Sequence, residues 1–192
     1  MSDTVRKRPS LVVRLLRPVA HLWLWAVNMR VEGQMPDLAK FVIVAAPHKT
    51  NWDLPNALAA GLHYGIRIHW LGKASLFKWP FGGLMRWLGG ISVDRSKSNN
   101  LVASVVETFA AADRLILVIP PEGTRSDVAR WKSGFYHIAV GAKVPVVLTF
   151  VDYNSRKIGI AQVFRPTGDY EADLAIIQAV YAPMMPRPAA AA

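Results

Sequence analysis

The chain has 192 residues, of which 52% are hydrophobic and none is cysteine, and its 23 Lys and Arg outnumber its 13 Asp and Glu to give a net charge of +10. The length suffices for one domain with its own core, while the lack of cysteine excludes disulfides, thiolate catalysis and cysteine-ligated zinc and favours an interior compartment. The basic excess indicates an anionic partner, which a membrane surface, a phosphorylated substrate or nucleic acid would supply.

The first patterned stretch is residues 10–30. One helical stripe carries the polar and basic side chains Ser10, Arg14, Arg17, His21 and Asn28, and apolar side chains cover the rest. This arrangement is typical of an amphipathic helix in a membrane interface, and the alternative is a helix packed on the domain. No apolar run in the sequence approaches the ~18 residues of a membrane-spanning helix. Pro18 predicts a kink or a break in the helix.

From residue 41 onward, strand and helix patterns alternate. Apolar runs predict strands at 41–47, 66–71, 90–94, 115–119, 144–152 and 156–164. Helical spacing predicts helices at 54–63, 98–112, 133–142 and 169–181. The last two strands are joined by a short turn-rich link, which predicts an antiparallel hairpin, and the other links resemble strand–helix crossovers. The predicted fold class is therefore α/β: a single domain with a mixed β-sheet covered by helices, preceded by an N-terminal amphipathic helix.

Residues 48–53 carry the most informative pair of side chains. His48 and Asp53 stand five positions apart, directly after the apolar run 41–46. On one continuous helix they would point about 140° apart, so they can meet only if the chain turns between them. Pro55 suits the first turn of a helix and not its middle, which predicts His48 on the turn and Asp53 at the helix start. Asp53 could then accept from one imidazole nitrogen and leave the other free as a base.

A second segment, 121–126, follows the predicted strand 115–119. Gly123 permits a tight turn with exposed amides. Arg125 offers a planar, permanent cation that suits phosphate. An ordinary surface turn fits the segment equally well when it is taken alone.

Two further cations follow short apolar runs. Arg95 comes directly after Asp94 and is either a phosphate ligand or the ion-pair partner of that acid. Lys73 directly follows the short run Trp70-Leu71-Gly72. Residues 76–87 lie between them and are rich in aromatics and glycine, which fits an acyl-chain groove, a contact with the bilayer interface or a helix with core aromatics.

Taken together, these segments resemble the glycerolipid acyltransferase family, which includes the lysophosphatidic acid acyltransferases. The resemblance covers residues 42–147. His48 and Asp53 match the HX4D motif, a histidine, four variable residues and an aspartate. Gly90 and Arg95 match the second block of the family.

The remaining blocks extend this resemblance. Residues 121–126 match the third block, Pro-Glu-Gly-Thr-Arg-Ser, without change, and Val144 and Pro145 match the fourth. Lys73 corresponds to a lysine that is common between the first two blocks. The chain departs from the family in having Pro47 where many relatives have asparagine, and its further departures are Thr50 and Leu148, at positions that usually hold serine and proline.

The resemblance implies an O-acyltransferase of phospholipid synthesis. It would move a fatty acyl group to the hydroxyl of a lysophospholipid, with 1-acyl-glycerol-3-phosphate as the first expectation. It implies catalysis by His48 and Asp53, and it assigns acceptor binding to Lys73, Arg95, Glu122, Gly123, Thr124 and Arg125. The chain has no Gly-x-Ser-x-Gly elbow, which favours direct attack by the acceptor over an acyl-enzyme. A glycolipid or lyso-ornithine acceptor and a non-catalytic lipid-binding protein stay open as alternatives.

The amphipathic stretch, the composition of the tail and the resemblance together define the expected organisation and partners. Residues 1–35 would associate with the membrane, residues 36–182 would form the acyltransferase domain, and residues 183–192 would be a low-complexity tail. We expect no bound cofactor and no metal site, and acyl-CoA or acyl-carrier protein as co-substrate. The expected partners are a membrane surface, the lysophospholipid and the acyl donor. Nucleic acid is disfavoured because no recognised binding module is present. The protein would be peripheral (monotopic) on the cytoplasmic face of the membrane.

Overall fold

The computed structural model describes residues 9–46, 50–93, 98–123 and 131–183. Within these ranges, the strands are β1 (Arg30–Glu32), β2 (Lys40–Ala46), β3 (His69–Lys73), β4 (Gly90–Val93), β5 (Leu115–Ile119), β6 (Val146–Asp152) and β7 (Lys157–Phe164). The helices are α1 (Leu11–Ala26), α2 (Asp53–His63), α3 (Gly82–Trp87), α4 (Ser98–Ala111), α5 (Gly134–Gly141) and α6 (Tyr170–Tyr181), with a 3-10 turn η1 (Ala74–Phe77).

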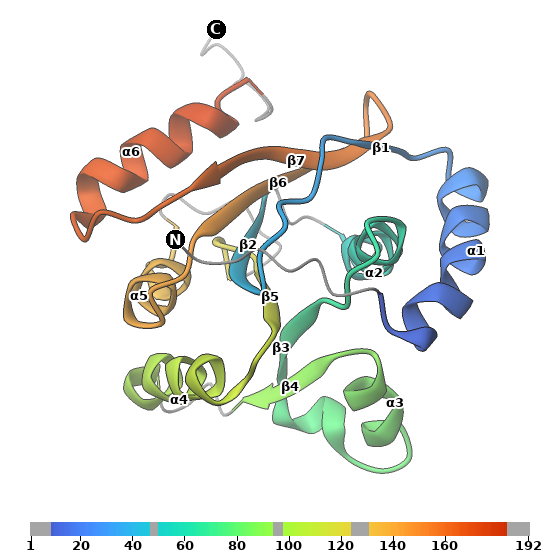
Figure 1. Ribbon diagram of the computed structural model, residues 1–192, viewed down its shortest axis with the longest axis horizontal. Helices are drawn as coiled ribbons and strands as arrows, with labels where there is room; N and C mark the ends of the chain where they lie inside the picture. The colour runs from blue at the N-terminus through green and yellow to red at the C-terminus, as the bar shows by residue number, and fades with distance from the viewer. Residues whose placement is uncertain (1–8, 47–49, 94–97, 124–130, 184–192) are drawn as a thin grey trace, which may run out of the picture.

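The strands form one mixed sheet in the order β1-β7-β6-β2-β5-β3-β4. β6 and β7 pair antiparallel as a hairpin, whereas the other neighbouring strands run parallel. Figure 1 shows α1, α2 and α3 on one side of this sheet and α4, α5 and α6 on the other. The prediction of an α/β fold with a mixed, helix-covered sheet and a final hairpin is confirmed.

The core lies on both faces of the sheet, because successive strand side chains point to opposite faces. On β2, Val42 and Val44 pack with side chains of α4, α5 and α6. Phe41 and Ile43 pack instead toward α2. A strand that is buried on both sides reads as a continuous apolar run, and this explains why residues 41–46 predicted a buried strand.

Helix α1 packs on α2 by one face and exposes the other. Ser10 caps it by accepting from the backbone N–H of Val13 at 3.4 Å. The inward-facing side chains of α1, which include Ala20 and Leu24, are buried against α2 and the β6–β7 hairpin. The outward side chains Leu11, Val12, Leu15, Val19, Leu22 and Trp25 are exposed. The helix is therefore packed on the domain and still presents an apolar surface, and its contact with a membrane stays a prediction.

Three features differ from the sequence prediction. α1 runs through Pro18 without the break that was one of the two predicted outcomes, and it packs on α2 beyond this residue. Strand β3 begins at His69 rather than at residue 66. The three-residue strand β1 was not predicted, because so short a segment shows no periodicity. Among the described helices, none is long and apolar enough to cross a bilayer.

Candidate active site

The parallel strands bring the predicted site segments to one edge of the sheet. β2, β5, β3 and β4 are neighbours in that order, so their carboxyl ends line the same edge. Lys73 ends β3, Asp53 follows β2, and Glu122 follows β5. Ligands of open parallel sheets bind at this edge, which gives the separate sequence segments a common location.

Asp53 is the centre of the described part of the site. It is the first residue of α2, as predicted, and its side chain is only 7% exposed. Its Oδ2 accepts from the backbone N–H of Thr50 at 2.9 Å, and its Oδ1 accepts from the Thr50 hydroxyl at 3.0 Å. The positive end of the helix dipole favours a carboxylate at this position. The carboxylate is therefore fixed in orientation by the turn that precedes its own helix.

Tyr153 is a second partner of this carboxylate, and no sequence motif pointed to it. Its hydroxyl donates to Oδ1 of Asp53 from the β6–β7 turn, 100 residues away in the chain. Burial raises the pKa of the Tyr153 hydroxyl, and its hydrogen bond to Asp53 adds to the increase. The phenol therefore stays a proton donor at neutral pH.

A hydrogen-bonded chain continues from Tyr153 to the N-terminal helix. The side-chain amide of Asn56 donates to the Tyr153 oxygen at 3.3 Å. The indole N–H of Trp23 on α1 donates to Oδ1 of Asn56 at 3.0 Å. Asn56 is 2% exposed, and a buried amide of this kind needs such partners. Side chains from α1, α2 and the β6–β7 turn thus jointly hold the Asp53 carboxylate in position.

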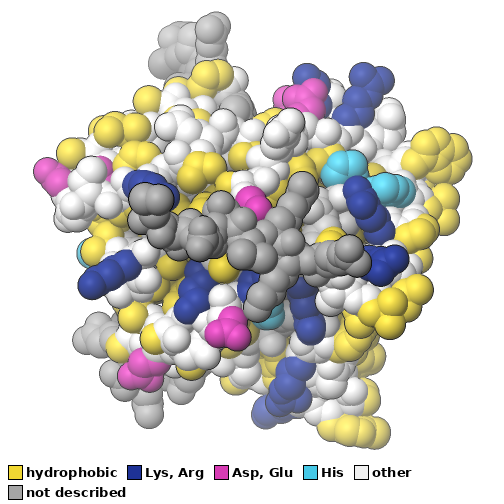
Figure 2. Space-filling model, viewed as in Figure 1, with side chains coloured by type: hydrophobic (Ala, Val, Ile, Leu, Met, Phe, Trp, Pro, Cys, Tyr) yellow, Lys and Arg dark blue, Asp and Glu magenta, His cyan; other side chains and the backbone are white. Residues whose placement is uncertain are grey.

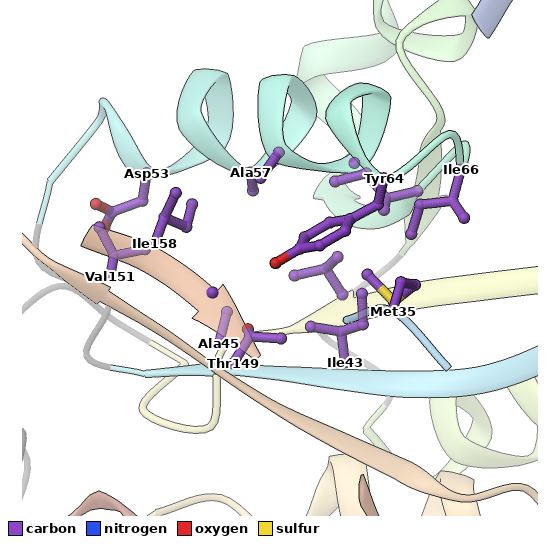
Figure 3. Close-up of a pocket in the computed structure, with 15 residues that line it drawn as sticks. Met35, Ile43, Ala45, Asp53, Ala57, Tyr64, Ile66, Thr149, Val151 and Ile158 are labelled. Atoms are coloured by element: carbon purple, nitrogen blue, oxygen red, sulfur yellow. The ribbon is translucent and has the colours of Figure 1, made fainter. Parts of the chain in front are cut away.

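An apolar cavity extends from Asp53 beneath α2. It contains about 560 Å³ of empty space, part of which is open to solvent, and its lining is mostly aliphatic or glycine. Figure 3 shows Asp53 at one end of the cavity, Ala57 along it, and Tyr64 and Ile66 at the other end. The separation of residues 53 and 64 along α2 corresponds to about 16 Å of helix axis. The shape suits a linear apolar ligand whose polar end lies near Asp53.

Tyr64 lies at the far end of this cavity, and its side chain extends toward the middle (Figure 3). Its hydroxyl donates to the backbone carbonyl of Glu32 at 2.6 Å. Burial raises the pKa of Tyr64 to about 12, and the charge of Glu32 adds to the shift. The ring is left as an apolar wall.

The other described site residues differ in exposure. Lys73 is exposed at the end of β3. Glu122 is 7% exposed, and its charge adds to the effect of burial in raising the pKa of Tyr181.

Gly123 has a φ of +65°, and a Cβ there would lie 2.7 Å from Cδ of Lys132. Lys132 therefore lies against this turn and is a further cation at the site, and no sequence motif pointed to it.

The remaining predicted site residues, His48, Arg95, Thr124 and Arg125, lie outside the described residues, so their roles stay predictions. Of the other histidines, His63 packs against His21 with ring centroids 5.1 Å apart, and His137 stacks on Tyr170. In the described ranges, no group of three or more His, Asp or Glu side chains is arranged to hold a metal ion.

The described part of the site is thus a buried carboxylate at one end of an apolar cavity in an α/β domain. Comparison with known proteins gives the class: the chain belongs to the Acyltransferase family, whose model matches residues 28–149. The prediction of a glycerolipid acyltransferase of the lysophosphatidic acid acyltransferase type is thereby confirmed at the level of the family.

Its similarity to particular proteins points the same way. The chain is 32% identical over 143 residues to the 1-acyl-sn-glycerol-3-phosphate acyltransferases of Escherichia coli K12 and Salmonella typhimurium, which covers 69% of this chain and 57% of each relative. It thus spans less than two thirds of their length. The fold is similar to the crystal structure of PlsC, the 1-acyl-sn-glycerophosphate acyltransferase of Thermotoga maritima, with a TM-score of 0.64, 20% identity, and coverage of 88% of this chain and 76% of that one.

Proposed function

We propose that this protein is an O-acyltransferase that transfers a fatty acyl group from acyl-CoA or acyl-carrier protein to the hydroxyl of 1-acyl-glycerol-3-phosphate. The observation that carries the proposal is the buried Asp53 carboxylate, held by several hydrogen bonds at one end of an apolar cavity. The names of the bacterial relatives support the same acceptor. The donor is a co-substrate, and the reaction needs no bound cofactor.

His48 acts as the general base in this proposal. It takes the proton from the acceptor hydroxyl as the oxygen attacks the thioester carbonyl, and it later gives that proton to the leaving thiolate. Asp53 accepts from the other imidazole nitrogen and stabilises the imidazolium, a type of assistance worth about 10²–10⁴-fold in rate. The hydrogen bond from Thr50 to Asp53 supports this pairing, because it folds the chain back between the two residues.

The cavity beneath α2 holds an acyl chain. Its lining is mostly apolar and suits a headgroup poorly, whereas a hydrocarbon chain entering it loses contact with water. Asp53 at one end leaves the reacting carbonyl near the base. The aliphatic wall thus positions the reaction as well as binding the substrate.

The acceptor phosphate is bound by Lys73, Arg95 and Arg125, with Lys132 beside them. Glu122 and Thr124 contact the glycerol backbone and hold its single free hydroxyl near His48, and amides near Gly123 stabilise the oxyanion. The exposure of Lys73 at the sheet edge and the tight turn at Gly123 support these assignments.

The membrane is the partner of the N-terminal segment. Residues 1–35 hold the protein on the cytoplasmic face as a monotopic protein, residues 36–182 form the catalytic domain, and residues 183–192 are a tail. The exposed apolar face of α1 beside Arg14 and Arg17 supports this division, because such a face binds anionic bilayers.

A panel of acceptors tests the function. Purified protein is incubated with palmitoyl-CoA and, in turn, 1-acyl-glycerol-3-phosphate, monoacylglycerol, a lyso-glycolipid and lyso-ornithine lipid, and free thiol is measured. We expect release with the phosphorylated acceptor and its loss in His48→Ala. Preference for an acceptor without phosphate would assign a different lipid, and absence of release from every pair while lipid is still bound would indicate a non-catalytic lipid-binding protein.

A further inference from the structure

Residues 76–87, between β3 and β4, expose five large apolar side chains. These are Leu76, Trp79, Phe81, Leu84 and Trp87. Trp79 is 94% exposed, the largest value among the exposed large hydrophobic side chains in the described residues. Single exposed apolar residues are common, but a cluster with two tryptophans and a phenylalanine is the kind of patch that marks a binding surface.

The segment is held from beneath by Phe77. This side chain is 7% exposed, and its ring lies 5.9 Å from that of Trp70. A Cβ at Gly72 or Gly90 would lie 2.7 or 2.8 Å from the Phe77 ring, so both glycines leave room for it. Arg86 places its guanidinium 5.8 Å from the ring centroid. The outward aromatics therefore project from a fixed base.

Two stretches of the sequence, one of which includes this segment, contain basic residues and no acidic ones. Residues 4–31 and 54–93 together carry ten of the 23 Lys and Arg and none of the 13 Asp and Glu. The rest of the chain has equal numbers of both, so the whole net charge of +10 belongs to these two stretches. They are also the stretches that contain the exposed faces of α1 and of residues 76–87.

The two exposed faces lie on the same side of the sheet. Figure 1 places α1 and α3 both on the side covered by α2. In Figure 2, hydrophobic side chains line the right-hand edge over α1 and the lower right over α3, with Lys and Arg side chains beside them. Lys78 and Arg86 are exposed next to the aromatics.

From these observations we propose that residues 76–87 form a second membrane-contacting element, which inserts aromatic side chains into an anionic lipid surface at the same time as α1. Tryptophan prefers the boundary between headgroups and acyl chains, and flanking cations bind anionic headgroups. An acidic carrier protein would match the charge but not an apolar cluster with so exposed a tryptophan, and a second copy would bring like charge against like. The inference rests on the proposed membrane location and not on the proposed chemistry.

Site-specific labelling tests it, because the chain has no cysteine of its own. Phe81→Cys carries an environment-sensitive dye, and Ile176→Cys on α6 is the matched control, since Ile176 is 50% exposed on the other side of the sheet. The probe is a vesicle of equal parts phosphatidylcholine and phosphatidylglycerol with doxyl-labelled lipid. We expect a blue shift and quenching of the dye at 81 and no change at 176.

A second variant measures the contribution to binding. Trp79→Ser combined with Leu84→Ser should lower vesicle partitioning by about tenfold or more, because each buried apolar side chain contributes about this factor. Thiol release with a short-chain, dispersed acceptor should stay unchanged, which separates this test from failure of the proposed reaction. Equal dye responses at 81 and 176 would overturn the proposal. So would a dye at 81 that responds to an acidic carrier protein or to dimerisation and not to vesicles.

Discussion

The orientation of one carboxylate depends on a tyrosine from a distant turn. Asp53 receives hydrogen bonds from the N–H and hydroxyl of Thr50 and from the hydroxyl of Tyr153. A buried carboxylate with several donors is stabilised in its charged form and held in one rotamer. In the proposed reaction this charge is what balances the imidazolium of His48.

Tyr153→Phe removes the third donor without changing the shape of the ring. We expect kcat to fall about tenfold with little change in KM, because a hydrogen bond to a charged group is worth about 1.5–3 kcal/mol and part of it is used in the transition state. The matched control is Tyr136→Phe, since Tyr136 donates to Asp173 at 2.7 Å. That variant should lose stability and keep kcat. Equal loss of kcat in both would assign Tyr153 a purely structural role.

At the scale of the elements, α2 forms one wall of the cavity. Ala57 lines it in mid-helix, so Ala57→Leu would fill part of the space for an acyl chain. The ratio of kcat/KM for decanoyl-CoA over palmitoyl-CoA should rise about tenfold or more, because each methylene in an apolar pocket changes binding substantially. Ala175→Leu on the exposed face of α6 is the control. An unchanged ratio would mean that the acyl chain binds outside this cavity.

The contact between α1 and α2 should depend on pH. The pKa of His63 is lowered from 6.5 by burial first, and then by the charges of His21 and Arg17. The unfolded state therefore binds the proton more readily, so stability should decline as the pH falls through ~6.5 toward the lower folded pKa. Urea midpoints across this range should fall more steeply for the wild-type protein than for His63→Gln. Parallel pH profiles of the two proteins would contradict this.

At the scale of the molecule, the features that could be predicted from the sequence are those that depend on hydrophobic periodicity or on a short continuous motif. The alternation of apolar runs predicted the six longer strands, and residues 48–53 with Pro55 predicted Asp53 at a helix start. The contacts that hold Asp53 could not be predicted, because Tyr153 lies in a segment recognisable only as a turn and meets Asp53 through strand order alone. The sequence could not decide whether the aromatics of residues 76–87 are core or surface residues. The structure shows both, because Phe77 is buried and Trp79 is exposed.

The two faces of α1 should separate folding from membrane binding. Leu15 and Leu22 are 67% and 63% exposed, so replacing both by serine should reduce the membrane-bound fraction and leave Tm unchanged. Leu24 is 4% exposed, and Leu24→Ser should cost about 3 kcal/mol or more of folding free energy. Sedimentation with vesicles and thermal unfolding measure both effects. A loss of Tm in the double variant would mean that its outward face is packed.

A double-mutant cycle on His48 and Asp53 tests whether the two side chains act as a catalytic pair. kcat/KM for thiol release is measured for His48→Ala, Asp53→Ala and the combined variant, with palmitoyl-CoA and 1-acyl-glycerol-3-phosphate. If Asp53 acts through His48, the combined variant should be no slower than His48→Ala alone, because groups that act as a unit are strongly non-additive. If the two losses multiply, or if Asp53→Ala keeps wild-type activity, the carboxylate does not orient that imidazole and the mechanism proposed for this site is wrong.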